Sequence, residues 1–540
     1  MITRHQRPVL IVGGGPVGLA LAVEIGWRGI ACMLVEQGDG SIVSPKMNEV
    51  NIRTMEFCRR WGIAKDVYES PFPPDYPLDV AFVTTLAGHE LSRLRVPPRM
   101  TKPESHSPVR QQVCSQMWFD PILQGCARTF PNVELRYRTR LEAFEASDEG
   151  VTAHVVDLQS GRRERVEAAY LVGCDGANSV VRRGLGIELG GRGVLDHSLN
   201  LFFRAPDLLK TCGKEPGTTF IAVDHSGLWA ILRAIDPANA MWRLMVLAID
   251  AKETPESIDR EALICRLTGR PMDVEWLSLS IWTRRSAVAE RYSRGRVFLA
   301  GDAVHQFSPS GGQGMNTGIG DAVDLGWKLA AVLDGWGGDR LLPSYDSERR
   351  PIGTRNVDLT TGFYLDHHNF ADGLAVIEEG APSACRKRQR LGEALVRDVG
   401  RMFCTAGLQL GYSYENSPIC ISDGTSPGPD DPTEYIPSTR PGSRAPHIWL
   451  LDGHSILDLY GRGFVLLRFG ANAPDVTAVE SAAAARGIPL KSATVTTPEA
   501  MELYGRRLVL VRPDGHVAWR GDEPPPSPTE LIERVCGVAA

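Results

Sequence analysis

The first forty residues show the clearest alternation of apolar runs and glycine-rich breaks in the chain. Val9–Val12 form an apolar run that leads straight into glycines, which is typical of a buried parallel strand. Leu19–Trp27 carry apolar residues at helical spacing, and Gly29 follows where a helix would end. Ala31–Val35 are apolar again and are closed by Glu36. The pattern predicts a strand, a helix and a second strand, which together make a βαβ unit.

The glycines between the first strand and the helix follow the order G-x-G-x-x-G. Gly13 permits the tight turn, Gly15 removes a side chain where backbone must approach a pyrophosphate, and Gly18 lets the helix pack on the strand. The helix N-terminus then offers free N–H groups to the diphosphate. Glu36 stands where an acid accepts hydrogen bonds from a ribose diol, and its charge disfavours a 2′-phosphate. The predicted dinucleotide-binding residues are Gly13, Gly15, Pro16, Gly18, Glu36 and Gln37.

The region after this unit combines helical and strand-like patterns. A polar loop precedes a helix over residues 51–61, and Lys46 and Arg53 on this stretch are candidates to face the cofactor or the substrate. Residues 66–110 contain many prolines and aromatics with little periodicity, which predicts short strands and loops. A helix over residues 113–128 carries Gln116 in its first turn, and two strand pairs follow up to residue 166.

Two later apolar strands each end in an acidic tip. The first, from Tyr170, leads into Asp175-Gly176 and a helix start, and the second, Val297–Ala300, leads into Gly301-Asp302. A carboxylate at such a tip is placed to accept hydrogen bonds from ribityl or ribose hydroxyls or from a nearby N–H. A loop rich in proline and glycine follows Asp302 and precedes a helix from Met315, where clustered N–H groups can hold an electron-rich ring edge.

The middle and the end of the chain have different patterns. Residues 185–282 carry short β-rich runs, which predict a separate antiparallel sheet with one face able to cover a pocket. Proline and glycine cluster in residues 423–446 as a linker. The segments after the linker predict a β-α-β-β unit without a C-x-x-C pair. Thiol–disulfide chemistry is therefore not expected, and the unit is expected to have a packing or dimer role.

Composition narrows the class of protein. The 540 residues include 59 basic and 65 acidic side chains, and this net charge of −6 gives no basic footprint for nucleic acid or an anionic membrane. No apolar run reaches the roughly 18–20 residues that span a bilayer. The polar start of the chain lacks a signal-peptide layout, so a cytoplasmic location is expected. The 11 cysteines show no metal-ligand spacing, and no metal is expected.

Three motifs occur in the order and spacing of one family. GGGPVG with Glu36 is followed by CDGANSVVRR at 174–183 and by GRVFLAGDAVHQFSPSGGQGMNTGIGDAVDLGWKLA at 295–330. PKMNEVNIRTMEFCRRWG at 45–62 also fits. Over about residues 8 to 420 the chain resembles the class A FAD-dependent aromatic hydroxylases, the para-hydroxybenzoate and phenol hydroxylase group. Its tail resembles the thioredoxin-like C-terminal domain of phenol hydroxylases.

This resemblance implies an α/β fold in several parts. They are a Rossmann-like FAD-binding domain over residues 1–184 with an inserted β excursion at 66–110, an antiparallel β-sheet substrate domain over 185–284, a continuation of the FAD-binding domain with a helical segment over 285–400, a linker over 401–446, and a thioredoxin-like domain over 447–540.

The resemblance also assigns flavin contacts residue by residue. Asp302 would bind ribityl hydroxyls, and Gln116 matches a glutamine near the ribityl phosphate. Lys46 stands where many relatives have arginine. Main-chain groups from Gly314 to Asn316 would contact the pyrimidine edge of the flavin. The predicted flavin-binding residues outside the first unit are Lys46, Arg53, Gln116, Asp175, Asp302, Pro309, Gly312, Gly314, Met315 and Asn316.

The implied activity is an FAD-dependent monooxygenase that uses NAD(P)H and O2 to hydroxylate a phenolic aromatic substrate through a flavin C4a-hydroperoxide, with NAD(P)H bound only transiently. Asn48 stands where phenol hydroxylases have an aspartate that helps to ionise the phenol, so the base is unassigned. The candidate catalytic residues are Pro309, Asn48, His225 and Tyr292. Baeyer–Villiger oxygenation or epoxidation on the same fold, and a non-oxygenating flavin protein, stay open as alternatives. A homodimer is a further expectation.

Overall fold

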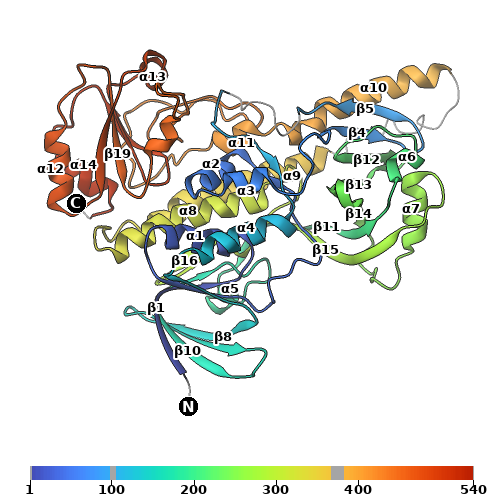
Figure 1. Ribbon diagram of the computed structural model, residues 1–540, viewed down its shortest axis with the longest axis horizontal. Helices are drawn as coiled ribbons and strands as arrows, with labels where there is room; N and C mark the ends of the chain where they lie inside the picture. The colour runs from blue at the N-terminus through green and yellow to red at the C-terminus, as the bar shows by residue number, and fades with distance from the viewer. Residues whose placement is uncertain (1–2, 98–104, 367–381, 539–540) are drawn as a thin grey trace.

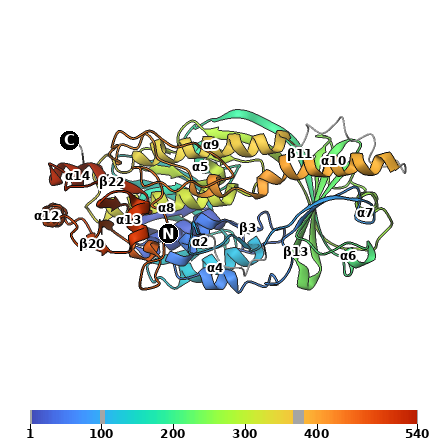
Figure 2. The same ribbon diagram turned by 90° about the horizontal axis from the view of Figure 1, so that it is seen from above.

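The computed structural model describes residues 3–97, 105–366 and 382–538 of the chain. Three bodies follow one another along its longest axis (Figures 1 and 2). A central body holds the N-terminal βαβ unit, a second sheet lies at one end, and the C-terminal domain lies at the other. The order of these bodies in space differs from their order in sequence, because the central body is assembled from both early and late segments.

The central body is built on a largely parallel sheet with strand order β16-β17-β10-β1-β2-β7. Its strands are β1 (Thr3–Val12), β2 (Cys32–Val35), β7 (Val133–Arg136), β10 (Arg163–Gly173), β16 (Ser293–Arg294) and β17 (Val297–Leu299). The antiparallel strands β8 (Thr139–Ala146) and β9 (Val151–Asp157) extend β10. The predicted strand–helix–strand unit is confirmed as β1, α1 (Pro16–Trp27) and β2.

The helices of this body pack on the sheet or against one another. They are α1, α2 (Ile52–Arg60), α3 (Ala64–Tyr68), α4 (Gln116–Arg128), α5 (Val180–Gly184), α8 (Gly314–Leu333) and α9 (Ser344–Asp366). Helix α1 packs between α4 and α8, and its residues Gly18–Gly26 are buried. The apolar cluster that this burial creates is the largest driving force for folding of the body.

Strand register brings the predicted motifs to one edge of this sheet. Val12 at the end of β1 pairs with Gly173 of β10, and Gly173 pairs with Leu299 of β17. Because these strands are parallel, their carboxyl ends lie side by side, and the segments that follow each of them start from neighbouring points. Adjacent carboxyl ends of this kind are where α/β sheets place ligands.

The second sheet has eight strands in the order β18-β15-β11-β14-β13-β12-β4-β5. They are β4 (Val80–Val83), β5 (Glu90–Leu94), β11 (Leu189–Arg204), β12 (Thr219–Asp224), β13 (Gly227–Asp236), β14 (Met241–Ile249), β15 (Glu275–Ala289) and β18 (His305–Gln306). The segment at 66–110 was expected as an excursion of the FAD-binding domain, but its strands β4 and β5 belong to this sheet. The four residues of β4 are all buried, and parallel pairing with β12 is what buries them.

The two faces of the second sheet have different partners. One face packs its apolar side chains against α6 (Leu208–Thr211) and α7 (Arg260–Thr268) at the outer end of the molecule (Figure 1). The other face is turned toward α9, α10 (Pro382–Asp398) and α11 (Ala406–Leu410), and Ile231 and Phe363 share a buried cluster there. A short ribbon of β3 (Glu49–Val50) and β6 (Gln112–Val113) belongs to the central body.

The C-terminal domain is a four-stranded sheet in the order β20-β19-β21-β22 with a thioredoxin-like arrangement. Its elements are β19 (Phe464–Phe469), α12 (Thr477–Ala485), β20 (Leu490–Val495), α13 (Pro498–Tyr504), β21 (Leu508–Val511), β22 (Val517–Gly521) and α14 (Pro528–Val535). The sequence predicted only β-α-β-β. Strand β20 was missed because just one of its six side chains is buried, so it carries no apolar run.

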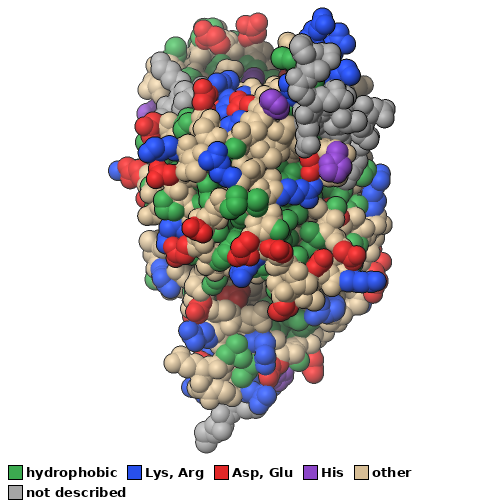
Figure 3. All heavy atoms as spheres, turned by 90° about the vertical axis from the view of Figure 1, so that its right-hand side faces the viewer, with side chains coloured by type: hydrophobic (Ala, Val, Ile, Leu, Met, Phe, Trp, Pro, Cys, Tyr) green, Lys and Arg blue, Asp and Glu red, His purple; other side chains and the backbone are tan. Residues whose placement is uncertain are grey.

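No helix within the described ranges is long and apolar enough to cross a membrane. The end of the molecule that is formed by the second sheet carries basic and acidic side chains interspersed with apolar ones (Figure 3).

Candidate functional site

The three glycines of the turn between β1 and α1 have different surroundings. Protein backbone fills the space beside two of them, and the space beside the third is open to a ligand. Gly13 has φ +109°, and an ideal Cβ there would lie 2.3 Å from the carbonyl oxygen of Cys174. A Cβ on Gly18 would lie 2.0 Å from the carbonyl oxygen of Gly13. A Cβ on Gly15 would meet no described atom within 4 Å. Gly15 is also the N-cap of α1, so this open space adjoins the free N–H groups that bind a diphosphate.

Glu36 is fixed by backbone rather than by side chains. Its carboxylate accepts hydrogen bonds from the Gly14 N–H and the Gly38 N–H, each at 2.7 Å. Each carboxylate oxygen keeps a second acceptor position, so both can still bind a ribose diol. Gln37, which follows it, is exposed.

The two acidic strand tips have different surroundings. Asp175 accepts hydrogen bonds from the Val180 N–H at 2.7 Å and the Val181 N–H at 3.1 Å, so it binds the N-terminal turn of α5. Its Oδ1 is buried without a described partner. Asp302 accepts no such bond from a described residue. Solvent reaches its side chain, yet the surrounding protein raises the pKa of its carboxyl, a combination expected on a concave surface. Lys46 is close enough to counter part of this increase.

The loop before α8 is shaped by two glycines with positive φ. Gly311 has φ +80° and Gly312 has φ +65°, conformations that other residues rarely adopt. Pro309 is exposed, and its carbonyl accepts the Gly312 N–H at 3.1 Å. Gly314 begins α8. The N–H groups of its first turn, before Thr317, are the free donors of a helix N-terminus, which fits the ring edge of a flavin.

Asn316 uses its side chain to join this loop to α2. Its Oδ1 accepts hydrogen bonds from the Asn51 N–H at 3.0 Å and the Thr54 hydroxyl at 2.8 Å. Its Nδ2 donates to the carbonyls of Gly312 at 2.8 Å and Glu49 at 3.2 Å. The side chain therefore has a positioning role, while its main chain is free for the predicted flavin contact. Met315, beside it, is half-buried.

Three further predicted residues meet around residues 46–48. The Gln116 Oε1 accepts the Lys46 N–H at 3.0 Å, and its Nε2 donates to Asp120 at 3.0 Å. The Lys46 side chain is exposed toward Asp302, as described above. Asn48 is buried, and its Oδ1 has no hydrogen-bond partner among the described residues. An unsatisfied buried acceptor at a predicted catalytic position is consistent with a ligand that donates a hydrogen bond there.

Two predicted residues, Arg53 and His225, have surroundings that point to other roles. Arg53 is buried between Glu56, at 2.8 Å, and the carbonyl of Asp514 in the C-terminal domain, at 2.7 Å. It therefore joins two bodies. His225 is exposed in the β12–β13 turn beside Asp224, which pairs with Arg266 of α7 at the outer end. Neither residue has a described contact with the loops at 46–50 or 309–314.

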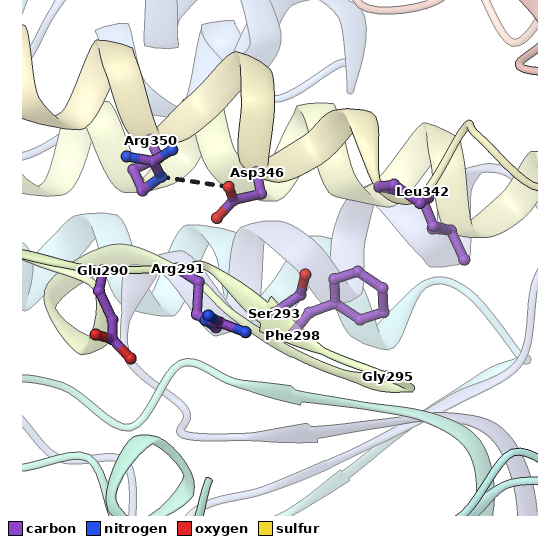
Figure 4. Close-up of a pocket in the computed structure, with 9 residues that line it drawn as sticks. Glu290, Arg291, Ser293, Gly295, Phe298, Leu342, Asp346 and Arg350 are labelled. Carbon is purple, nitrogen blue, oxygen red and sulfur yellow. Dashed lines mark hydrogen bonds and ion pairs between the residues drawn. The ribbon is translucent and has the colours of Figure 1, made fainter. Parts of the chain in front are cut away.

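Tyr292 lies in the core of the central body. It is fully buried, its hydroxyl has no partner in the described part of the chain, and burial raises its pKa well above the usual value. Its ring packs against His305 and Tyr345. A surface hollow near it lies between α9 and the β16–β17 hairpin and contains the 3.2 Å ion pair of Arg350 with Asp346 (Figure 4). None of the predicted flavin residues lines this hollow.

The sequence predicted a sheet face over a pocket, but it did not identify the polar residues on that inner face. Ser198 and Asn200 of β11 pair with Trp282 and Ser280 of β15, so these side chains share one face. The Asn200 Oδ1 and the Trp282 Nε1 are buried without described partners. The period-two spacing of Ser278, Ser280, Trp282 and Arg284 was the signal available in the sequence.

Arg284 ties this face to the loop before α8. It is buried, pairs with Asp196 of β11 at 3.1 Å, and donates to the Ser308 hydroxyl at 2.9 Å. Tyr364 of α9 donates to the same Asp196 carboxylate at 2.6 Å. The sheet, α9 and the loop are therefore held together by one buried ion pair.

The chain is similar to known flavin enzymes along its whole length. A model of an FAD binding domain matches residues 6–360, and a model of the C-terminal part of aromatic-ring hydroxylases matches residues 438–539. The 4-methyl-5-nitrocatechol 5-monooxygenase of a Burkholderia species is 33% identical over 98% of this chain and 97% of its own length.

Solved structures of flavin enzymes are also similar to this chain. RebC, soaked with chromopyrrolic acid and with bound 7-carboxy-K252c, is 40% identical with a TM-score of 0.92, over 99% of this chain and 100% of that one. A ternary complex of aklavinone-11 hydroxylase with FAD and aklavinone is 30% identical with a TM-score of 0.81, over 98% of this chain and 99% of that one.

Proposed function

This chain belongs to the FAD-dependent aromatic-ring hydroxylases, and from that premise we propose that it hydroxylates a phenolic aromatic substrate with NAD(P)H and O2. One atom of O2 enters the ring as a hydroxyl, the other leaves as water, and NAD(P)H supplies the two electrons. FAD, when bound, supplies the redox chemistry and the activation of oxygen. The protein supplies binding, orientation and exclusion of water.

The observation that carries this proposal is the convergence of three segments on one place. The open space at Gly15 and the acids at the strand tips suit a dinucleotide. The loop that ends at Gly314 offers helix N-terminal N–H groups to a flavin ring. Arg284 holds that loop against a sheet face with unsatisfied polar atoms, which suits an aromatic guest with hydroxyl groups.

Asn48 is the residue that we propose to orient the phenol. A buried amide oxygen without a partner accepts a hydrogen bond from a phenolic hydroxyl and draws electron density toward the ring. Unlike an aspartate, it cannot take the proton. A phenol of pKa about 10 therefore keeps its proton at pH 7 unless the substrate itself is more acidic.

Oxidation of NADPH and of NADH by the FAD-loaded enzyme tests the proposal. The relatives are named for, or were solved with, both polycyclic compounds and a single-ring nitrocatechol, so the panel should contain aklavinone and chromopyrrolic acid beside simple phenols and nitrocatechols. We expect at least a tenfold increase in the rate of oxidation with one member, and one ¹⁸O atom from ¹⁸O2 in a ring hydroxyl of the product.

Two outcomes would contradict it. Incorporation of ¹⁸O into an ester or an epoxide would show the Baeyer–Villiger or epoxidising reaction instead. No stimulation by any member of the panel, with FAD fully bound, would favour a flavin protein that does not oxygenate.

A further inference from the structure

Two arginines lie side by side on the inner face of the second sheet. Arg233 of β13 and Arg243 of β14 are direct cross-strand partners. Like charges in this position destabilise a sheet, so the pair needs a compensating anion. Arg233 has one, because its Nη2 lies 2.9 Å from the Glu49 Oε1.

Arg243 has no such partner. Its Nη1 donates to the carbonyls of Pro45 at 2.9 Å and Lys46 at 3.2 Å, and no ion pair joins it to a carboxylate in the described part of the chain. Two cations therefore share the single carboxylate of Glu49. Burial lowers the pKa of Arg243 to about 10, and the charge of Arg233 adds to this effect. The pair therefore carries one positive charge more than the described carboxylates beside it neutralise.

The pair lies beside the predicted ring-binding loop. A Cβ on Gly312 would lie 3.1 Å from the Glu49 Oε2, so the carboxylate that Arg233 binds touches the loop before α8. Phe202 of β11 is the other cross-strand neighbour of Arg243. Two residues further along β14, Met245 lies on the same face between Asn200 and Ile231. This face is thus cationic at Arg233 and Arg243. Next to the two arginines it is apolar at Met245, with the amide of Asn200 beside it.

We propose that the substrate is an aromatic carboxylic acid whose carboxylate binds Arg243 and Arg233. This inference rests on the proposed function and specifies its substrate class. The arginine fork binds a carboxylate through two parallel N–H groups, and the half-buried setting makes that bond stronger than it would be in water. With the acid held there, the rest of the ring system extends over Met245 and Asn200 toward the loop before α8.

Binding to the oxidised, FAD-loaded enzyme tests this without turnover, so a failure here is separate from a failure of the hydroxylase reaction. The probes are pyrene-1-carboxylate and anthracene-2-carboxylate, each beside its neutral carboxamide, followed by the change in flavin absorbance and tryptophan fluorescence. We expect each acid to bind at least tenfold more tightly than its amide.

Substitutions test whether Arg233 and Arg243 cause the preference for acids over amides. Arg243→Met should reduce the acid-to-amide ratio to about one while the amide still binds, and Glu49→Gln should raise affinity for the acids. The matched control is Arg204→Met on β11, an exposed arginine that pairs with Glu275 and should leave the ratio unchanged. The ratio of flavin to protein absorbance checks that each variant retains FAD.

Several results would overturn the proposal. Equal binding of acids and amides by the wild-type protein would do so, as would a preference that survives Arg243→Met, or failure of both acids to bind at 1 mM. Competition by 2′-AMP that is lost in Arg243→Met would instead assign the arginines to the phosphate of NADPH.

Discussion

At the residue scale, the glycines of the first turn divide into two kinds. Gly13 and Gly18 are required by neighbouring backbone, because a side chain on either would collide with a carbonyl oxygen. At Gly15, no described atom would collide with a side chain. The φ of −74° and ψ of −179° of this glycine are open to any residue. We therefore attribute the absence of a side chain there to the diphosphate that the sequence predicts at this turn.

This distinction predicts the effect of Gly15→Ala. The variant should keep the thermal stability of the apoprotein but bind FAD at least tenfold more weakly, a loss of about 1.4 kcal/mol. The control is Gly125→Ala in α4, where a Cβ also meets nothing within 4 Å, and which should leave FAD affinity unchanged. Titration of apoprotein with FAD, followed by flavin fluorescence, measures both. Unchanged affinity in Gly15→Ala would remove the diphosphate from this turn.

Asp120 gives a prediction for pH. Burial raises its pKa to about 7, while the hydrogen bond from Gln116 opposes the rise. A carboxyl whose folded pKa lies above its unfolded value stabilises the fold most below pH 4, and that contribution is lost as pH rises through 7. Asp120→Asn should therefore gain stability relative to wild type between pH 5 and pH 8, by on the order of 2–3 kcal/mol.

Denaturant unfolding of both proteins at the two pH values measures this difference. Asp148→Asn, at an exposed turn, is the control and should show no such trend. A difference that stays constant with pH would mean that Asp120 is ionised at little cost. The result bears on the site, because Gln116 links Asp120 to Lys46.

At the element scale, α8 serves two sites. Its N-terminal turn faces the predicted flavin ring, and its middle carries Asp324 and Lys328 into a buried ionic cluster. Arg512 of the C-terminal domain enters that cluster and lies 3.0 Å from Asp324 and 2.6 Å from Glu348. The helix pattern predicted α8, but nothing in the local sequence indicated which buried charges would meet there.

Arg512→Met should therefore be strongly destabilising. It leaves Asp324 and Glu348 buried with only Lys328 between them, and breaking a buried pair in this way costs about 3–5 kcal/mol. Arg506→Met, which breaks an exposed pair with Asp522, should cost about 0–1 kcal/mol. Unfolding in urea compares the two. Similar costs would mean that water reaches the Arg512 cluster in solution.

At the scale of the whole molecule, the C-terminal domain shares a core with the central body. Trp327 of α8 is fully buried, and its ring packs edge-on against Phe464 of β19. Its cluster includes residues from both bodies. A domain boundary near residue 447, as the sequence suggested, separates segments of chain that the fold packs together.

The shared core predicts that the two bodies unfold together. Trp327→Ala should lower stability by about 3–5 kcal/mol and should shift FAD release and the far-ultraviolet circular dichroism transition to the same lower temperature. Trp449→Ala, whose side chain is half exposed on the C-terminal domain, should shift neither by more than a small amount. Separate transitions in Trp327→Ala would show that the bodies are independent.

The sequence by itself determined the parts whose cause is local. The βαβ unit follows from apolar spacing and from glycines that only a tight turn requires, and the two acidic strand tips follow from the same pattern. Each of these signals depends on residues that are close together in the chain, so the sequence alone is enough to identify it.

Only the tertiary structure decided which distant residues meet. It placed residues 80–94 in the second sheet, moved Arg53 to the contact with the C-terminal domain, and closed Tyr292 into the core. It also set Arg233 against Arg243 and brought both to the loop at residues 45–49. Strand register and interdomain packing depend on pairings between remote segments, and the energy of those pairings is absent from any single stretch of sequence.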